Sequence, residues 1–377
     1  MTDATSDPNA AAIQAVAGAL LPLLQAMDAM TWARQRLDPY AMKQLADAIA
    51  AQATPLREAL PAFRAADLPE ALGEFAAAVR TAADATLKAY DGLDAAKAAE
   101  GFDALRLARR AVRAHLAAER AIYPLAALSP PVSQYFLPPE RREDAALLAR
   151  LDEAADRPMQ TGGVRSFPGP EDAERGGFAC YVPEYLDPAA PAPVCLALHG
   201  GRGNGPDYLW SWLPAARAMG VVLIAPTARG DTWAIMGEDV DSPNIARIMD
   251  DVAAVQALDR SRVLMTGMSD GGTFSYVAGL LDGGVATHLA PFAASFHPML
   301  LEFVSADRLA NLPIRLTHGA RDWMFQIDVA RMAAEAFRGR EARLVYRELP
   351  DRAHVFPQDE CLPALEWFLN DGEMDAS

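Results

Sequence analysis

From about residue 160 onward, the chain alternates short apolar runs with segments of helix length. The runs include PVCLALHG, GVVLIAPT, RVLMTG, FAASFHP, PIRLTHG and RLVYREL, and the longer segments include DYLWSWLPAARAM, NIARIMDDVAAVQAL and QIDVARMAAEAF. Strands that alternate with helices predict a mostly parallel sheet covered by helices on both faces. In such sheets, functional side chains gather at the carboxyl ends of the strands.

Residues 9 to about 128 have a different composition, with many alanines and few glycines. Apolar residues recur there at intervals of three and four, as in LGEFAAAVRTAADATL, which predicts four or five amphipathic helices packed as a bundle. The stretch LSPPVSQYFLPPERRED follows, and one more helix is expected at about 140–155. We therefore expect a helical bundle and linker over 1–157 and an α/β domain of about eight strands over 158–377.

A serine lies between glycines in the stretch VLMTGMSDGGTF, which contains Ser269. The residues before it are typical of a buried strand, and those after it are typical of a helix. A sharp strand-to-helix turn needs small flanking residues, and it presents the serine hydroxyl at a helix N-terminus. Ser269 is therefore a candidate nucleophile. The alternative is a glycine-rich turn that holds an incidental serine.

A serine hydroxyl needs a base beside it to act as a nucleophile. His354, in the stretch LPDRAHVFP, follows the last apolar run, and Asp322, in LTHGARDWMF, follows the run before that one. Taken alone, His354 could be an ordinary surface histidine, and Asp322 could cap a helix that starts near residue 325. Together with Ser269, they follow successive strands in the order Ser, Asp, His, which predicts a catalytic triad.

An oxyanion hole is expected at the stretch LALHGGRGNG. The backbone N–H groups of Gly201 and Asp270 are its candidate donors. A phosphate-binding loop is the alternative, but the stretch lacks the lysine of a P-loop and the dinucleotide spacing. Side chains near these loops are candidates for substrate contact: Arg202, Trp233, Trp323 and His297.

Four spaced motifs, HGG, GMSDG, HGARD and DRAHVF, together resemble the α/β-hydrolase superfamily over about residues 160–372. The stretches LHGGRGNG and APTARGDTW are similar to the phospholipase/carboxylesterase group and to esterases of the esterase D type. The resemblance implies a cofactor-free serine esterase whose nucleophile is Ser269, acid Asp322 and base His354, with Gly201 and Asp270 as oxyanion donors. The N-terminal helical region has no counterpart in the minimal family fold.

The sequence therefore predicts an enzyme that cleaves small carboxylic esters through an acyl-enzyme intermediate. A thioesterase or a peptidase could use the same triad. A different class of protein, a non-catalytic scaffold assembled through the bundle, is the other alternative. The bundle either docks beside the mouth of the site or forms a homodimer.

Composition excludes several other classes. The formal net charge of −16 argues against a nucleic-acid partner. The three cysteines are too far apart for a zinc site or a disulfide framework, so we expect neither metal nor cofactor. The first ten residues lack lysine and arginine, and Gln14, Pro22 and Gln25 interrupt the apolar stretch that follows. We therefore expect no signal peptide, no membrane span and a cytoplasmic protein.

Overall fold

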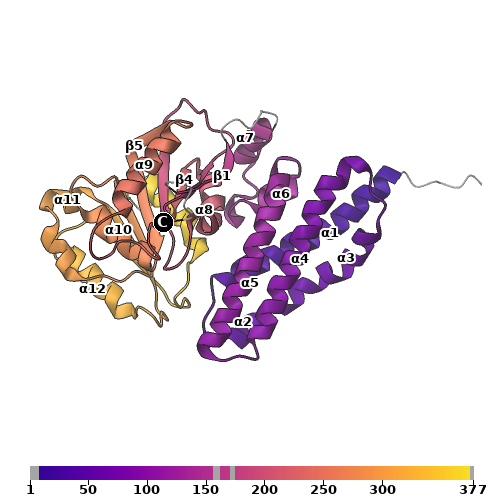
Figure 1. Cartoon of the computed structure of the whole chain (residues 1–377), viewed down its shortest axis with the longest axis horizontal. Helices are drawn as coiled ribbons and strands as arrows, with labels where there is room; N and C mark the ends of the chain where they lie inside the picture. The colour runs from indigo at the N-terminus through magenta and orange to yellow at the C-terminus, as the bar shows by residue number, and fades with distance from the viewer. Residues whose placement is uncertain (1–7, 156–161, 170–174, 374–377) are drawn as a thin grey trace, which may run out of the picture. The chain divides into compact units, whose positions relative to one another are not determined.

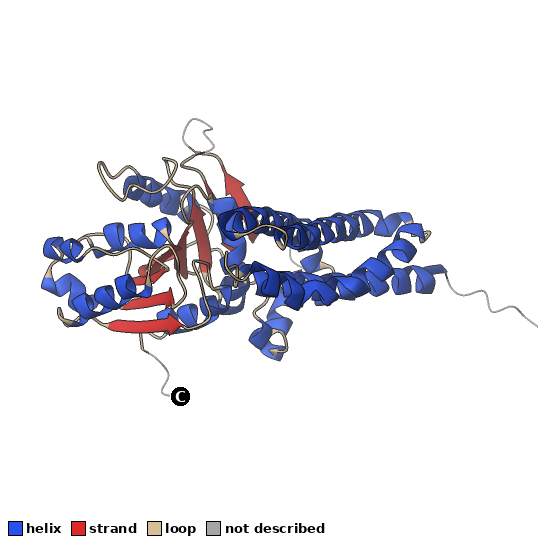
Figure 2. Ribbon diagram, turned by 90° about the horizontal axis from the view of Figure 1, so that it is seen from below, coloured by secondary structure: helices blue, strands red, loops and turns tan. Residues whose placement is uncertain are grey.

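The structure is a computed structural model that describes residues 8–155, 162–169 and 175–373. The chain divides into two compact units, Met1–Phe136 and Leu137–Ser377. The first unit is helical, and the second is built on a sheet (Figures 1 and 2). The sequence predicts this division into a helical part and an α/β part.

The helical unit contains α1 (Pro8–Arg34), α2 (Met42–Ile49), α3 (Thr54–Ala65), α4 (Gly73–Ala96), α5 (Gly101–Ile122) and α6 (Pro130–Tyr135). Small residues let α4 and α5 approach closely along their length. A Cβ atom added to Gly92 of α4 would lie 3.0 Å from the Cβ of Ala111 on α5. The alanine-rich composition of this region therefore serves close helix packing.

Helix α1 is apolar around most of its surface. Leu23, Met27 and Met30 are fully buried in the helical unit, and the Tyr90 hydroxyl donates a hydrogen bond to the Ala26 carbonyl at 2.9 Å. By length and composition, its segment Ala12–Arg34 could also cross a membrane, because its mean hydropathy is 1.3; about 39% of its apolar stretch is buried. A bundle helix with one buried face meets the same criteria, so this is weak evidence for a span.

The second unit is built on eight strands in the order β1-β2-β4-β3-β5-β6-β7-β8. Strand β2 runs antiparallel to β1 and β4, and the other neighbouring pairs are parallel. The bounds are β1 (Gly163–Phe167), β2 (Phe178–Val182), β3 (Ala192–Leu198), β4 (Val222–Pro226), β5 (Leu258–Met268), β6 (His288–Phe292), β7 (Ile314–Gly319) and β8 (Leu344–Leu349). The α/β-hydrolase fold class expected from the sequence, with about eight mostly parallel strands, is confirmed.

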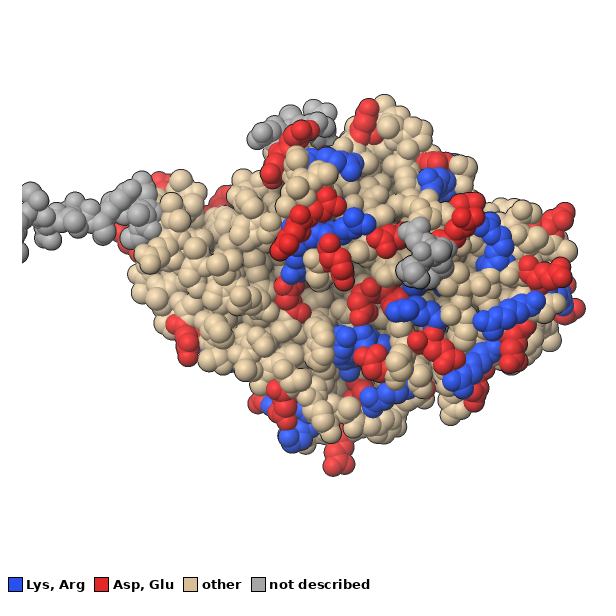
Figure 3. Space-filling view, turned by 180° about the vertical axis from the view of Figure 1, so that it is seen from behind, with Lys and Arg blue, Asp and Glu red and all other residues tan. Residues whose placement is uncertain are grey.

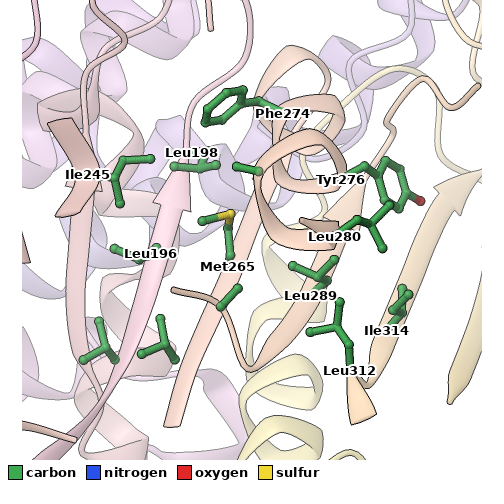
Figure 4. Packing of buried hydrophobic residues seen from close by; sticks show 14 of the residues in the cluster. Leu196, Leu198, Ile245, Met265, Phe274, Tyr276, Leu280, Leu289, Leu312 and Ile314 are labelled. Atoms are coloured by element: carbon green, nitrogen blue, oxygen red, sulfur yellow. The ribbon is translucent and has the colours of Figure 1, made fainter. Parts of the chain in front are cut away.

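Helices cover the sheet as the sequence predicts. Helix α8 (Gly205–Met219) packs on β2, β3 and β4 and against α13 (Cys361–Leu369). Side chains from α9 (Asp241–Ala253), α10 (Asp270–Leu280) and α12 (Ile327–Arg338) join a core cluster with alternate strand residues such as Leu196 and Leu198 (Figure 4). The short helix α11 (Ala306–Asn311) leads into β7. All three cysteines are buried, and the Cys361 thiol lies 3.5 Å from the Ser211 carbonyl oxygen.

Helix α7 (Ala145–Ala155) belongs to the second unit, although the sequence analysis groups it with the bundle. Its residues Leu147 and Leu151 pack with Leu137 against Tyr185. The Arg150 guanidinium also lies 4.0 Å from the centre of the Tyr185 ring. The division at residue 136 is therefore earlier than the expected boundary at 157.

The expected strand over FAASFHP is wrong. Strand β6 lies earlier, at His288–Phe292, because it aligns Leu264 of β5 with His288 and Met268 with Phe292. Strands β1 and β2 are additions that the sequence analysis does not place.

Candidate active site

Ser269 lies on the turn between β5 and α10, with φ 55° and ψ −120°. A non-glycine residue with this backbone is strained, and such strain is typical of functional positions. A Cβ on Gly271 would lie 2.5 Å from the His199 carbonyl oxygen, and one on Gly267 would lie 2.5 Å from the Gly271 carbonyl carbon. Only glycine fits on either side, as the sequence analysis expects of a strand-to-helix turn around a nucleophile.

The structure brings the three candidate triad residues together. The Nε2 atom of His354 lies 3.1 Å from the Ser269 hydroxyl oxygen, and its Nδ1 atom lies 2.8 Å from Oδ2 of Asp322. A carboxylate only accepts, so Nδ1 carries the proton and Nε2 is free to accept the serine proton. All three residues are buried, with exposed fractions of 7% or less. The arrangement is that of a nucleophile, a base and an orienting acid.

Asp322 is held by the turn that follows it. Its Oδ1 atom accepts hydrogen bonds from the backbone N–H groups of Met324 and Phe325, both at 2.8 Å. Burial alone would raise the pKa of Asp322, but hydrogen bonds from His318, His354 and the Phe325 backbone outweigh it and hold that pKa well below its usual range. Asp322 is therefore a carboxylate at neutral pH, and it can stabilise an imidazolium on His354.

The loop that carries His354 packs tightly against the loop that carries Asp322. The Arg321 backbone N–H donates to the Arg352 carbonyl at 2.9 Å. A Cβ on Gly319 would lie 2.8 Å from the Ala353 carbonyl oxygen, so glycine is needed for this approach. The distance between base and acid is thus set by backbone contacts as well as by the side chains themselves.

The glycine loop after β3 lies beside the nucleophile turn. A Cβ on Gly200 would lie 3.7 Å from the Ser269 Cβ, and one on Gly201 would lie 2.6 Å from Oδ2 of Asp270. Among the described turns and loops, the N–H groups of Gly201 and Asp270 donate to no backbone carbonyl. An oxyanion hole requires two neighbouring backbone donors beside the nucleophile, and Gly201 and Asp270 are neighbours there.

His199 shapes the glycine loop from within. Its Nδ1 donates to the Gly200 carbonyl at 2.7 Å, and its Nε2 accepts from the Ala228 backbone N–H at 3.1 Å. Burial lowers the pKa of His199 to about 4, so the neutral imidazole is kept at neutral pH. This histidine supports its own loop and takes no part in the proton transfer expected of His354.

The four candidates for substrate contact occupy different surroundings. Trp233 is buried, stacks on Phe274 and donates its indole N–H to the His199 carbonyl at 2.7 Å, so it supports the glycine loop. Trp323 is half-buried, and its ring meets that of His354 edge-on at 5.6 Å. Arg202 and His297 are exposed. Of the four, Trp323 has a ring contact with a triad residue.

Arg202 has a left-handed backbone conformation, which the amino-acid sequence does not predict. Its φ is 58°, in the left-handed region that bulky residues seldom adopt, and its backbone N–H donates to the Asp231 carbonyl at 3.1 Å. The loop after β4 thus holds the glycine loop in a strained shape next to the candidate oxyanion donors.

Two further hydrogen bonds beside the candidate site are not predicted by any sequence motif. The Thr232 hydroxyl donates to Oδ2 of Asp270 at 2.6 Å, and the Ser269 backbone N–H donates to the Phe292 carbonyl at 3.0 Å. Thr232 lies in the stretch GDTW, whose sequence carries no signal for this role. Across the described residues, no group of three or more histidine, cysteine or acidic side chains could hold a metal ion.

Comparisons with known proteins give a limited likeness. No protein-family model matches the chain. Over 149 residues, or 38% of this chain, it is 32% identical to a bifunctional acetylxylan esterase/xylanase of Neocallimastix patriciarum. The chain spans 21% of the length of that protein.

Among solved structures, the apo form of Thermogutta terrifontis esterase 2 is 17% identical with a TM-score of 0.43, over 57% of this chain and 96% of that one. A bifunctional GH43-CE protein of Bacteroides eggerthii is 14% identical with a TM-score of 0.49, over 56% of this chain and 38% of that one. Because the sequence identities and TM-scores are this low, the activity has to be argued from the geometry of the site.

Proposed function

We propose that the chain is a serine hydrolase that cleaves carboxylic esters through an acyl-enzyme intermediate. The observation that carries the proposal is the continuous hydrogen-bonded chain from Ser269 through His354 to Asp322, which begins on a strained turn. A scaffold that needs no chemistry has no reason to retain this strain and this geometry together.

The first half of the reaction follows from the hydrogen-bond directions. His354 Nε2 takes the proton of the Ser269 hydroxyl as its oxygen attacks the ester carbonyl carbon. The negative charge that develops on the carbonyl oxygen is stabilised by the N–H groups of Gly201 and Asp270. When the intermediate collapses, the carbon–oxygen bond to the alcohol breaks, and the imidazolium returns its proton to the leaving alcohol.

The second half repeats these steps with water. His354 accepts a proton from a water molecule that attacks the acyl-enzyme carbonyl, and it then protonates the Ser269 oxygen as the acid leaves. Asp322 remains ionised throughout, because its hydrogen bonds lower its pKa in spite of burial. Its charge holds the imidazole in the required tautomer and stabilises the imidazolium.

The proposal is tested by labelling and turnover with one variant. The full chain is expected to react with a fluorophosphonate probe at Ser269 and to hydrolyse p-nitrophenyl acetate, whereas Ser269→Ala does neither and keeps the wild-type melting temperature. Equal turnover in the two proteins would reject the site. If the wild-type protein shows neither labelling nor turnover, the result would favour the alternative hypothesis of a non-catalytic scaffold.

A substrate panel would then decide among the reactions that one triad can perform. It contains p-nitrophenyl esters of increasing acyl length, a thioester and a peptide. Acetylated xylan is included because a matched relative is named as an acetylxylan esterase. Faster turnover of the thioester or the peptide than of every oxygen ester would replace the esterase proposal.

A further inference from the structure

A second histidine lies against the triad carboxylate. His318, near the end of β7, is fully buried, and its Nε2 atom is 2.7 Å from the Phe325 carbonyl oxygen and 3.4 Å from Oδ2 of Asp322. A carbonyl only accepts, so Nε2 carries a proton, and the Phe325 oxygen is the nearer of its two neighbouring oxygen atoms. The reaction proposed for Ser269 and His354 gives this imidazole no step.

The hydrogen bond of His318 closes the loop that shapes the acid. Phe325 donates its backbone N–H to Asp322 at 2.8 Å and accepts from His318 with its carbonyl oxygen. The residue at the end of the loop is thereby fixed at both of its backbone polar groups. If His318 were removed, the Phe325 carbonyl would lose its partner in a partly buried site, where an unpaired polar group is costly.

The same loop also carries aromatic rings that flank the base. The Phe325 ring meets the His354 imidazole edge-on at 5.4 Å, and the Trp323 ring does so at 5.6 Å. A shift of the loop would therefore move the Asp322 carboxylate together with the two aromatic rings that contact His354. Misplacement of catalytic groups by about 1 Å is enough to cost on the order of 10²-fold in rate.

His318 uses one of its two ring nitrogen atoms, Nε2, in its hydrogen bond to Phe325. Among the described residues, its Nδ1 atom is buried without a hydrogen-bond partner. The hydrogen bond to the Phe325 carbonyl is made by Nε2–H. The imidazole acts through that one N–H, so an amide N–H in the same place should replace it.

We propose that His318 is a positioning residue, which fixes the 319–325 loop through Phe325 and so sets the Asp322 carboxylate and the rings beside His354. This rests on the hydrolase proposed above. His318 touches no reacting atom, and its contribution is to orient the acid and the base.

The test compares matched variants in the full chain, with rates expressed per fluorophosphonate-reactive site. His318→Phe keeps a ring and loses the N–H, and it is expected to lower kcat for p-nitrophenyl acetate about 10- to 100-fold with little change in KM. His318→Gln can place an amide N–H near the Nε2 position and should recover most of that loss. His318→Asn is too short to reach Phe325 and should not.

The control is His288→Phe. His288 is another buried strand histidine, but it lies at the start of β6 beside Trp367 and Phe368, and its imidazole has no contact with the triad. It should leave kcat within twofold of wild type. An equal loss in His288→Phe and His318→Phe would overturn the proposal, as would unchanged kcat in His318→Phe. If His318→Phe does not fold, equal rates in the Gln and Asn variants would overturn it.

A spectroscopic measurement separates this proposal from that of the hydrolase. The proton on His354 Nδ1, bonded to Asp322, should give a downfield proton NMR resonance in the wild type, and His318→Phe should shift or broaden it. An unchanged resonance would reject the positioning role. The resonance needs no turnover, so it decides on His318 even if the wild type hydrolyses no ester.

Discussion

Asp322 combines two roles that the sequence analysis treats as alternatives. Its Oδ1 atom accepts two backbone N–H groups, from Met324 and Phe325, while its Oδ2 atom accepts from His354. Helix α12 itself begins at Ile327 with Gln326 at its N-cap. Asp322 thus caps the turn that precedes the helix, and the same carboxylate orients the base.

Asp322→Asn tests which role matters more for the reaction. The amide can still accept the two turn hydrogen bonds, but it loses the charge and can present an N–H to His354, which favours the wrong tautomer. We expect kcat for p-nitrophenyl acetate to fall by a factor approaching about 10⁴, with a melting temperature near that of wild type.

Asp328→Asn is the matched control, because Asp328 is an exposed carboxylate in the first turn of α12. It should change neither quantity. A large fall in melting temperature with nearly wild-type kcat in Asp322→Asn would mean that Asp322 is a capping residue only.

At the scale of elements, most strands of the sheet could be predicted because they are short apolar runs with helices between them. Strand β6 could not be placed, because residues 286–296 are apolar almost throughout and offer several registers. Pro291 lies within that strand and argues against a central position. The residues that form β6 are decided by hydrogen-bonded pairing with β5, and the local sequence pattern carries no information about that pairing.

The candidate site shows the same limit. The triad residues could be predicted because each follows a strand in a recognised order. The contacts that position them could not, because the Trp233 bond to the His199 carbonyl and the His318 bond to the Phe325 carbonyl join side chains to backbone oxygens of other loop residues. Such partners depend on loop conformation and leave no residue-type signal.

Two glycine substitutions in different helices should change the free energy of unfolding in opposite directions, because their surroundings differ. A Cβ on Gly271 would overlap the Leu198 carbonyl, whereas one on Gly18 in α1 meets nothing within 4 Å. Gly271→Ala should destabilise the chain by roughly 1–3 kcal/mol and lower activity by displacing Ser269. Gly18→Ala should stabilise it by roughly 0.5–1 kcal/mol. Urea unfolding measures both, and a Gly271→Ala protein as stable and active as wild type would contradict this account of the turn.

For the whole molecule, surface charge and buried charge have different consequences. On the face seen in Figure 3, acidic and basic side chains are interspersed and do not gather into one large patch of either sign. Such a mixed surface favours solubility, and on that face it offers no field of a single sign. The dependence of stability on pH should come instead from buried groups whose pKa values change on folding.

Two buried histidines predict a loss of stability in mild acid. Burial lowers the pKa of His199 and of His288 to about 4, against about 6.5 in an unfolded chain. The unfolded state therefore binds more protons between these values. Stability is full above about pH 6.5 and falls towards pH 4, by up to about 1.4 kcal/mol per pH unit for each histidine. Urea unfolding from pH 7 to pH 4 measures the slope, which His288→Phe should reduce; a flat profile would contradict the prediction.

The last prediction concerns the independence of the second unit. Residues 137–377 contain every residue of the candidate site, one large core around the sheet, and the small cluster of Leu137, Leu147 and Leu151 against Tyr185. A shortened chain that begins at Leu137 should therefore fold cooperatively, react with a fluorophosphonate and hydrolyse p-nitrophenyl acetate at a rate near that of the full chain. One that begins at residue 158 lacks α7 and uncovers the apolar ring of Tyr185, so it should unfold at lower urea concentration.

Size-exclusion chromatography and turnover of bulky esters, compared between the full and shortened chains, then test what the helical unit does. A full chain that elutes as a dimer, beside a monomeric chain from Leu137 with the same ester preference, would support dimerisation through the bundle. A monomeric full chain whose preference for acyl length differs from that of the shortened chain would support restriction of access by the bundle. If the chain from Leu137 aggregates while the chain from residue 158 is stable and active, the division at residue 136 is wrong, and the boundary at 157 expected from the sequence is the correct one.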